Sequence, residues 1–218
     1  MFKSLRYDIQ AILQRDPAAR NGFEVFFLYS GFHALMWHRT AHFFYTHKMK
    51  FIGRMLSQTG RFFTGVEIHP AAQIGRGLMI DHGMGVVIGE TTVIGDNCTI
   101  YQGVTLGGTG KESGKRHPTL GNNVMVGSGA KVLGPFTVGD NSKIAAGAVV
   151  LNEVPANSTA VGIPARVVKR DGVNVNDCDL DQIKIPDPIT QQLCTLSVHV
   201  ATLEREIAEL KNRALKNE

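Results

Sequence analysis

The chain has 218 residues with a formal net charge of +4, and 43% of its residues are hydrophobic against 19% charged. This length suits one or two domains with a buried core, and the composition excludes wholesale disorder. No apolar stretch is long enough to span a membrane, no signal peptide opens the chain, and the charge excess forms no basic stripe for nucleic acid. The three cysteines fit neither a disulfide framework nor a zinc site, so we expect a cytoplasmic protein.

Residues 1–64 are predicted to form a helical domain, and fourteen of the sixteen aromatic side chains fall within it. Asp16 precedes a proline, a pair typical of an N-cap and the first residue of a helix. The apolar stretch 23–51 predicts a packed helical hairpin. His38 and His42 lie four residues apart without the carboxylate of a metal-binding helix between them, so we expect them to pack or cap.

An aliphatic side chain recurs at every sixth position of a second domain, residues 65–172. This period matches neither an α-helix nor an array of ordinary hairpins, and it predicts very short strands wound into a solenoid of about four triangular coils. Two extra residues follow Ile80 and eight follow Leu106. The aliphatic positions, which we expect to point inward, are Ile68, Ile74, Ile80, Ile88, Ile94, Ile100, Leu106, Leu120, Val126, Val132, Val138, Ile144 and Val150.

Small residues occupy two further positions of the repeat. Glycine commonly follows the aliphatic residue, and we expect it to adopt a positive φ that allows a tight corner. Examples are Gly75, Gly95, Gly127 and Gly139. Four residues after each aliphatic position comes a second inward candidate, often small: Ala72, Cys98, Ala130, Ser142 and Ala148.

Two segments follow the solenoid. Residues 173–188 contain two prolines and are predicted to be a linker. Residues 189–218 are predicted to form a coiled-coil helix, because apolar residues repeat at alternating spacings of four and three. These heptad positions are Ile189, Leu193, Leu196, Val200, Leu203, Ile207, Leu210 and Ala214. The predicted fold class is therefore α + β: a helical N-terminal region, a hexapeptide solenoid and a C-terminal coiled-coil helix.

Three strings are more specific than the period of six. They are Asp81-His82-Gly83-Met84-Gly85, V-T-L-G-G-T-G-K at 104–111 and R-H-P at 116–118. In this order they resemble the serine O-acetyltransferases, a family of hexapeptide-repeat acyltransferases. The resemblance implies a left-handed parallel β-helix. It also implies transfer of the acetyl group of acetyl-CoA to the hydroxyl of L-serine, giving O-acetyl-L-serine and CoA, the step before cysteine synthesis. No metal is expected.

The resemblance also implies an assembly. A homotrimer with its active sites between neighbouring subunits is expected, and a dimer of trimers is the alternative. The best-known members end in an isoleucine that docks into O-acetylserine sulfhydrylase. This chain ends in Lys216-Asn217-Glu218, so we do not expect that docking.

His82 is the candidate general base. A serine hydroxyl must lose its proton as it attacks a thioester, and histidine, with an unperturbed pKa of about 6.5, suits this role. His82 lies next to the two-residue break in the repeat, where a side chain can leave the packed wall. Glu67 precedes it by nearly one coil and is the candidate that orients the imidazole. The best-known family members have aspartate at the position of Glu67.

The eight-residue insertion is interpreted as a basic active-site flap. Arg116 is expected to clamp the serine carboxylate, because guanidinium binds carboxylate through two hydrogen bonds, and His117 to help hold the substrate. The resemblance implies that Asp16 and Asp81 bind the serine ammonium or hydroxyl. It also implies a CoA groove lined mostly by small residues: Gly108, Thr109, Ser128, Lys143 and Ala146.

Three other functions remain open at this point. Another hexapeptide acetyltransferase would act on the hydroxyl of a sugar or an antibiotic, although the R-H-P string and the helical N-terminus argue against it. A γ-type carbonic anhydrase would need three zinc-binding histidines, and the solenoid has only His69, His82 and His117 in unsuitable contexts. A scaffold that acts through its coiled coil would leave the chemistry-bearing residues unexplained.

Overall fold

The structure is a computed structural model, and it describes residues 2–110 and 113–174. A C-terminal group of described residues, 195–196, 198–200, 202–205 and 207, is helical. Most of the predicted linker and part of the predicted heptad lie outside the described residues. The heptad positions outside them are Ile189, Leu193, Leu210 and Ala214.

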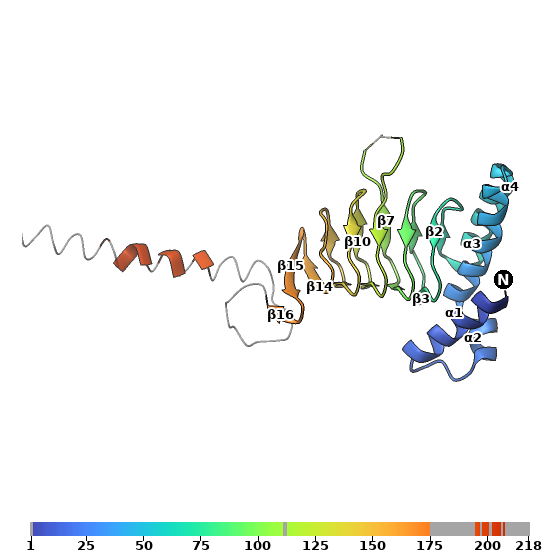
Figure 1. The fold of residues 1–218 in the computed structure, drawn as a ribbon, viewed down its shortest axis with the longest axis horizontal. Helices are drawn as coiled ribbons and strands as arrows, with labels where there is room; N and C mark the ends of the chain where they lie inside the picture. The colour runs from blue at the N-terminus through green and yellow to red at the C-terminus, as the bar shows by residue number, and fades with distance from the viewer. Residues whose placement is uncertain are drawn as a thin grey trace, which may run out of the picture.

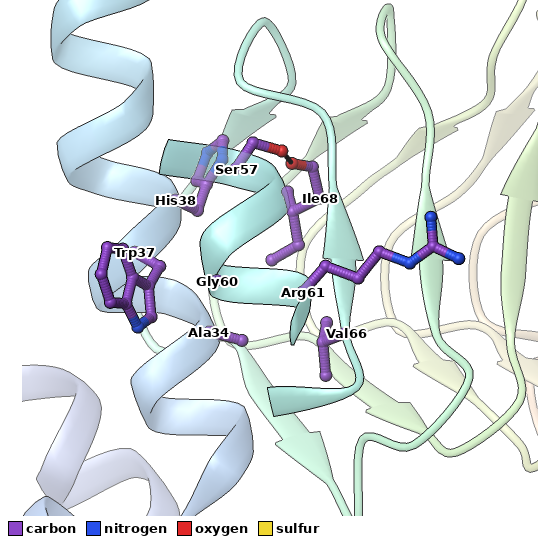
Figure 2. A pocket seen from close by; sticks show the side chains of 8 residues that line it. All are labelled: Ala34, Trp37, His38, Ser57, Gly60, Arg61, Val66 and Ile68. Atoms are coloured by element: carbon purple, nitrogen blue, oxygen red, sulfur yellow. Dashed lines mark hydrogen bonds between the residues drawn. The ribbon is translucent and has the colours of Figure 1, made fainter. Parts of the chain in front are cut away.

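Four helices lie at the end of the solenoid where its first coil begins (Figure 1). They are α1 (Phe2–Arg15), α2 (Gly22–Leu28), α3 (Ser30–Thr46) and α4 (Lys50–Thr64). A packed helical hairpin is present, but it is formed by α3 and α4 and so extends to Thr64, beyond the predicted stretch 23–51, whose first residues belong to α2. Gly60 faces Trp37 so closely that an added Cβ would lie 2.7 Å from the Trp37 Cβ. The Ser57 hydroxyl donates to the carbonyl of Ile68 at 2.7 Å, which ties the hairpin to the first strand (Figure 2).

Asp16 begins no helix, so the predicted N-cap is wrong. α1 ends just before it, and the next helix, α2, follows Asn21, whose side chain accepts a hydrogen bond from the backbone N–H of Glu24. Asp16 instead closes a turn, because its Oδ1 accepts from the N–H of Ala18 at 2.8 Å. Aspartate stabilises turns and helix caps through the same kind of hydrogen bond, so the residue pair alone could not separate the two.

The strands form three sheets, which are the faces of the solenoid. The five-stranded sheet has the order β1-β4-β7-β10-β13, and the four-stranded sheet has the order β11-β8-β5-β2. The seven-stranded sheet, β16-β15-β14-β12-β9-β6-β3, is parallel except at β15 and β16. The strand bounds are β1 (Glu67–Ile68), β2 (Gln73–Ile74), β3 (Met79–Asp81), β4 (Val87–Ile88), β5 (Val93–Ile94), β6 (Thr99–Tyr101), β7 (Thr105–Gly107), β8 (Thr119–Leu120), β9 (Met125–Val126), β10 (Lys131–Leu133), β11 (Thr137–Val138), β12 (Lys143–Ile144), β13 (Val149–Val150), β14 (Ser158–Gly162), β15 (Ala165–Arg170) and β16 (Val173–Asn174).

The predicted inward positions make the core. All the predicted aliphatic residues are buried except Ile74, which is partly buried, and the five small residues at the second position are buried as well. The solenoid has about five coils instead of the four expected. The extra coil departs from the period of six: Val154 bridges Val138, and Ala160 of β14 pairs with Ile144. The six-residue period of the sequence therefore ends at Val150, although the solenoid continues for a further coil.

The glycines that follow the aliphatic residues do not adopt positive φ, so that expectation is wrong. They are required because successive coils approach closely there. A Cβ added to Gly95 would lie 2.6 Å from the carbonyl oxygen of Gly121, and one added to Gly127 would lie 2.6 Å from the Ala146 nitrogen. Positive φ falls at other corners instead, on stacked asparagines and glycines. These residues include Asn97, Asn123, Asn141, Asn157, Gly85, Gly103, Gly129 and Gly147.

The histidines of α3 pack and bond to backbone, as predicted. His38 is buried, and Nδ1 of His42 lies 2.7 Å from the carbonyl oxygen of Pro70. Among the described residues, no group of three His, Cys, Asp or Glu side chains is placed to hold a metal ion. Within that same part of the chain, no helix is long and apolar enough to cross a bilayer.

Candidate active site

His82 occupies the corner between β3 and β4, where the two extra residues of the repeat are placed. Its φ is 57°, and Gly83 and Gly85 in the same corner have φ of 72° and 74°. A left-handed backbone costs a non-glycine residue about 1–2 kcal/mol, so its surroundings must hold it. One contact that does so is the Ser30 hydroxyl, which donates to the His82 carbonyl at 3.4 Å. The side chain of His82 is 74% exposed, so the imidazole leaves the wall of the solenoid.

The Asp81 carboxylate lies beside this histidine, and Tyr29, which holds Asp16, lies close enough to Asp81 to be affected by its charge. Oδ1 of Asp81 is 3.9 Å from Nε2 of His82, and the Tyr29 hydroxyl donates to Oδ2 of Asp16 at 2.7 Å. Burial, the hydrogen bond with Asp16 and the charges of Asp16, Glu24 and Asp81 raise the pKa of Tyr29 to about 12. The structure therefore brings the predicted residues Asp16, Asp81 and His82 into one neighbourhood around Tyr29.

Glu67 has a partner other than His82. Its Oε2 lies 2.8 Å from Nη1 of Arg61, whose side chain leaves α4 toward the strands (Figure 2). Glu67 pairs in register with Val87 of β4, so the chain leaving the His82 corner runs directly beside it. The structure thus puts Glu67 on the strand next to the corner, and the orienting contact with His82 stays a prediction.

Arg116 and His117 lie at a different corner, after the insertion between β7 and β8. The described residues on either side of its tip project away from the coils (Figure 1). The guanidinium of Arg116 pairs with the carboxylate of Glu90. Oγ1 of Thr91 accepts the backbone N–H groups of Arg116 at 3.0 Å and of His117 at 3.1 Å. The ring of His117 covers Gly89 so closely that no Cβ would fit there.

The histidines of this second corner are held neutral. Burial lowers the pKa of His117, with the charge of Arg116 as the next cause. Burial also lowers the pKa of His69 to about 4. Nδ1 of His117 accepts the N–H of Thr91 at 3.2 Å, so the neutral ring carries its proton on Nε2. Charged groups of this corner include Arg116, Glu90 and Lys115, whose Nζ donates to the Thr91 carbonyl at 2.8 Å, and they suit the corner to recognition of a charged ligand.

The two groups lie at opposite ends of the strands of the five-stranded sheet. We call the corner before these strands the His82 edge and the corner after them the Arg116 edge of the solenoid. The chain enters that sheet from the His82 corner, passes through β4 and leaves it toward Glu90 and Thr91. His117 follows β7 of the same sheet and precedes β8 of the next one. One chain therefore does not bring Arg116 and His117 to His82.

Four of the five predicted CoA residues lie at the same two corners, and Lys143 lies at neither. Ser128 and Ala146 follow β9 and β12 on the His82 edge, and the Gly147 N–H donates to the Ser128 carbonyl at 2.8 Å. Glycines line this edge: a Cβ added to Gly103 would lie 3.5 Å from the Gly129 Cα. Gly108 and Thr109 follow β7 on the Arg116 edge, and Lys143 is exposed on β12 of the seven-stranded sheet.

The comparisons with known proteins agree with this architecture. The family profile "Serine acetyltransferase, N-terminal" matches residues 1–36. Two hexapeptide profiles match residues 85–108 and 117–152. The serine acetyltransferase of Bacillus pumilus is 55% identical over 212 residues, which cover 97% of this chain and 97% of that protein. This chain belongs to the serine acetyltransferase family.

Other family members match at similar levels. The serine acetyltransferase of Synechococcus elongatus is 55% identical over 96% of this chain and 85% of its own length. A solved serine acetyltransferase from Neisseria gonorrhoeae, in complex with serine, superposes with a TM-score of 0.75 at 45% identity, covering 77% of this chain and 69% of that one. The Brucella abortus enzyme in complex with coenzyme A gives 0.76 at 47% identity, covering 78% and 68%. The solenoid of this family member is thus a left-handed β-helix of hexapeptide repeats.

Sequence reasoning missed three residues of these two corners. Tyr29 and Glu90 bind the predicted residues Asp16 and Arg116, and Arg61 binds Glu67. Glu90 carried a usable signal, because it lies in the same solenoid corner, one coil before Arg116. Tyr29 and Arg61 come from helices, and no periodicity relates a helix to a particular coil.

Proposed function

We propose that this chain transfers the acetyl group of acetyl-CoA to the hydroxyl of L-serine, giving O-acetyl-L-serine and CoA, the step before cysteine synthesis. The observation that carries the proposal is the exposed imidazole of His82 at a strained corner, with the Asp81 carboxylate beside it and the Asp16 carboxylate held nearby by Tyr29. A base and two anions fit a substrate that carries both a hydroxyl and an ammonium group. The relatives bound to serine and to coenzyme A support the same substrates.

The proposed reaction is a single acetyl transfer. His82 accepts the hydroxyl proton as the serine oxygen attacks the thioester carbonyl, and a tetrahedral intermediate forms. When the intermediate collapses, the C–S bond breaks and the imidazolium returns its proton to the CoA sulfur. Asp16 and Asp81 hold the serine ammonium, and Arg116 and His117 hold its carboxylate. Glu67 orients His82 from the adjacent strand.

The complete site requires two copies of the chain, because its two halves lie at the His82 edge and the Arg116 edge of the solenoid, on opposite sides of one sheet face. A head-to-tail contact that joins the His82 edge of one subunit to the Arg116 edge of the next closes into a ring. We propose a ring of three, as the resemblance to the family implies, with a dimer of trimers as the alternative. CoA then lies in the groove between subunits, against Ser128 and Ala146 of one edge and Gly108 and Thr109 of the other, with Lys143 nearby.

The proposal extends to the cellular setting. A cytoplasmic location fits the cysteine content. A solved relative is a complex with cysteine. Cysteine differs from serine only by sulfur in place of oxygen, so we propose that it competes with serine here.

One assay tests the proposal. The purified protein is mixed with acetyl-CoA and, separately, with a panel of amino acids, sugars and aminoglycosides, and thiol release is followed. Release with serine alone is the expected result. Release with a sugar or an aminoglycoside and not with serine would favour the alternative, a hexapeptide acetyltransferase for another hydroxyl acceptor. The serine assay repeated with added cysteine should show competition against serine.

A further inference from the structure

The Tyr29 side chain connects the helical domain to the first coil. Tyr29 lies between α2 and α3, in an extended conformation with φ of −91° and ψ of 107°. Its ring packs against a buried cluster that includes Ile12 of α1, Phe32 of α3 and Met79 of β3. The ring is therefore held by two helices and by the strand that leads into Asp81 and His82.

The two residues after Tyr29 press directly on that strand. A Cβ on Gly31 would overlap the carbonyl of Ile80, so only glycine allows this approach. Ser30 donates its hydroxyl to the carbonyl of His82 at 3.4 Å. Residues 29–31 thus pack against the segment 79–82 of the first coil, through Met79, Ile80 and His82, and this packing fixes their distance from the His82 corner.

On its other side Tyr29 holds Asp16. The phenol hydroxyl donates to Oδ2 at 2.7 Å, while Oδ1 accepts the N–H of Ala18 at 2.8 Å. Both carboxylate oxygens are therefore oriented, and the carboxylate has no free rotation about its last bond. Because the pKa of Tyr29 is about 12, the phenol keeps its proton and remains a donor throughout the physiological range.

We infer that Tyr29 is a positioning residue for the amino-acid substrate: it sets the Asp16 carboxylate at a fixed place relative to Asp81 and His82. The inference rests on the proposed function, in which Asp16 binds the serine ammonium. Without the phenol hydroxyl, Asp16 would lie at the end of α1 with only its own turn to orient it. A misplaced carboxylate would weaken the ammonium contact and leave the CoA groove intact, since Ser128 and Ala146 lie farther along the solenoid.

Tyr29→Phe tests this in the full-length chain, because it removes the hydroxyl and keeps the packed ring. We expect the KM for serine to rise about tenfold, with the KM for acetyl-CoA and the melting temperature little changed. Tyr7→Phe is the matched control. It removes another tyrosine hydroxyl that ties α1 to the solenoid, through Oδ1 of Asn97 at 3.0 Å, and it leaves Asp16 untouched.

A double-variant cycle identifies the route of the effect. In an Asp16→Ala background Tyr29→Phe should add no further rise in KM, because there is no carboxylate left to orient. Equal serine KM values for Tyr29→Phe and Tyr7→Phe would overturn the inference, as would additive effects in the cycle or an equal loss for both substrates. Wild-type protein that does not acetylate serine would overturn the proposed function and this inference with it. Wild-type activity beside an unaffected Tyr29→Phe variant would overturn the inference alone.

Discussion

Arg61 and Glu67 form an ion pair in which Nη1 of the arginine lies 2.8 Å from Oε2 of the glutamate. The pair joins the last turn of α4 to β1, the strand beside the His82 corner. A carboxylate has about four acceptor sites, so Glu67 keeps capacity for a second donor while Arg61 holds it. The helical domain is therefore connected to the residue that we propose orients the base.

Replacing His82 by alanine should lower kcat at least about a hundredfold, the usual scale for loss of a general base. The exposed imidazole approaches Asp81 at 3.9 Å, and the contact with Ser30 is made by the backbone carbonyl, which the alanine variant keeps. Steady-state kinetics with serine and acetyl-CoA measure the effect, and unchanged melting behaviour is the control for folding. A variant that turns over at nearly the wild-type rate would reject His82 as the base.

Glu67→Gln should reduce kcat less than His82→Ala, because the base remains and only its orientation is lost. Glu67→Asp should retain more activity than the glutamine variant, since it keeps the charge that Arg61 and a protonated His82 both favour. The three variants are compared in the same assay. If the glutamine variant were as active as wild type, Glu67 would serve only the ion pair with Arg61.

The solenoid was predictable because its physics is local: one aliphatic side chain per six residues fills a narrow interior. The sequence did not show why glycine is required after the aliphatic residues. The close approach between Gly127 and Ala146 depends on how successive coils stack. The fifth coil was missed since Ala160 follows an irregular spacing.

The site was predictable only in part, and for a related reason. His82 and Arg116 stand next to irregularities of the repeat, which are visible in the sequence. Their separation onto two edges of one sheet requires the coil geometry. Tyr29 is supplied by a helical junction whose docking on β3 is decided by packing, so no pattern within the solenoid indicates it.

Arg116→Ala should raise the KM for serine about tenfold or more and leave the KM for acetyl-CoA little changed, because a carboxylate clamp serves only the amino acid. Glu90 holds the guanidinium in the described structure, and the same hydrogen bond lowers the pKa of Glu90. Two-substrate kinetics separate the KM values. Equal effects on both substrates would mean that the insertion acts as a general lid.

Gly127→Ala should destabilise the solenoid strongly, because the added Cβ would lie 2.6 Å from the Ala146 nitrogen in the next coil. Gly129→Ala is the matched comparison two residues away. No atom lies within 4 Å of its added Cβ, so only the backbone strain of a φ of 71° opposes the substitution, about 1 kcal/mol. Thermal melts should show a clearly larger loss at Gly127, and similar losses would contradict the close-approach explanation.

Stability should fall as the pH decreases from about 6.5 toward 4. Burial lowers the pKa of His38 to about 3 and that of His69 to about 4, below the unfolded value of about 6.5. The unfolded chain therefore binds more protons in this window. The contribution of the two neutral histidines to the free energy of unfolding is complete above pH 6.5 and decreases below it. Melting temperatures at pH 7 and pH 5 should differ by several degrees, and His38→Gln should reduce the difference. A flat profile in the wild type would refute this account.

The C-terminal heptad should support assembly and not catalysis. Its described apolar positions Leu196, Val200, Leu203 and Ile207 are 60%, 47%, 57% and 51% exposed in the single chain, as expected of a seam that needs a partner helix. β-branched residues at the a positions with leucine at d favour two strands, whereas a trimeric solenoid would bring three tails together, and we expect the trimer symmetry to prevail. A chain ending after Asn174, which keeps β16, should retain acetyl transfer from acetyl-CoA to serine. Its assembly should be weaker, so in light scattering it should dissociate at a higher protein concentration than the full chain does. Loss of activity in a truncated chain that stays trimeric would instead place the tail in the active site.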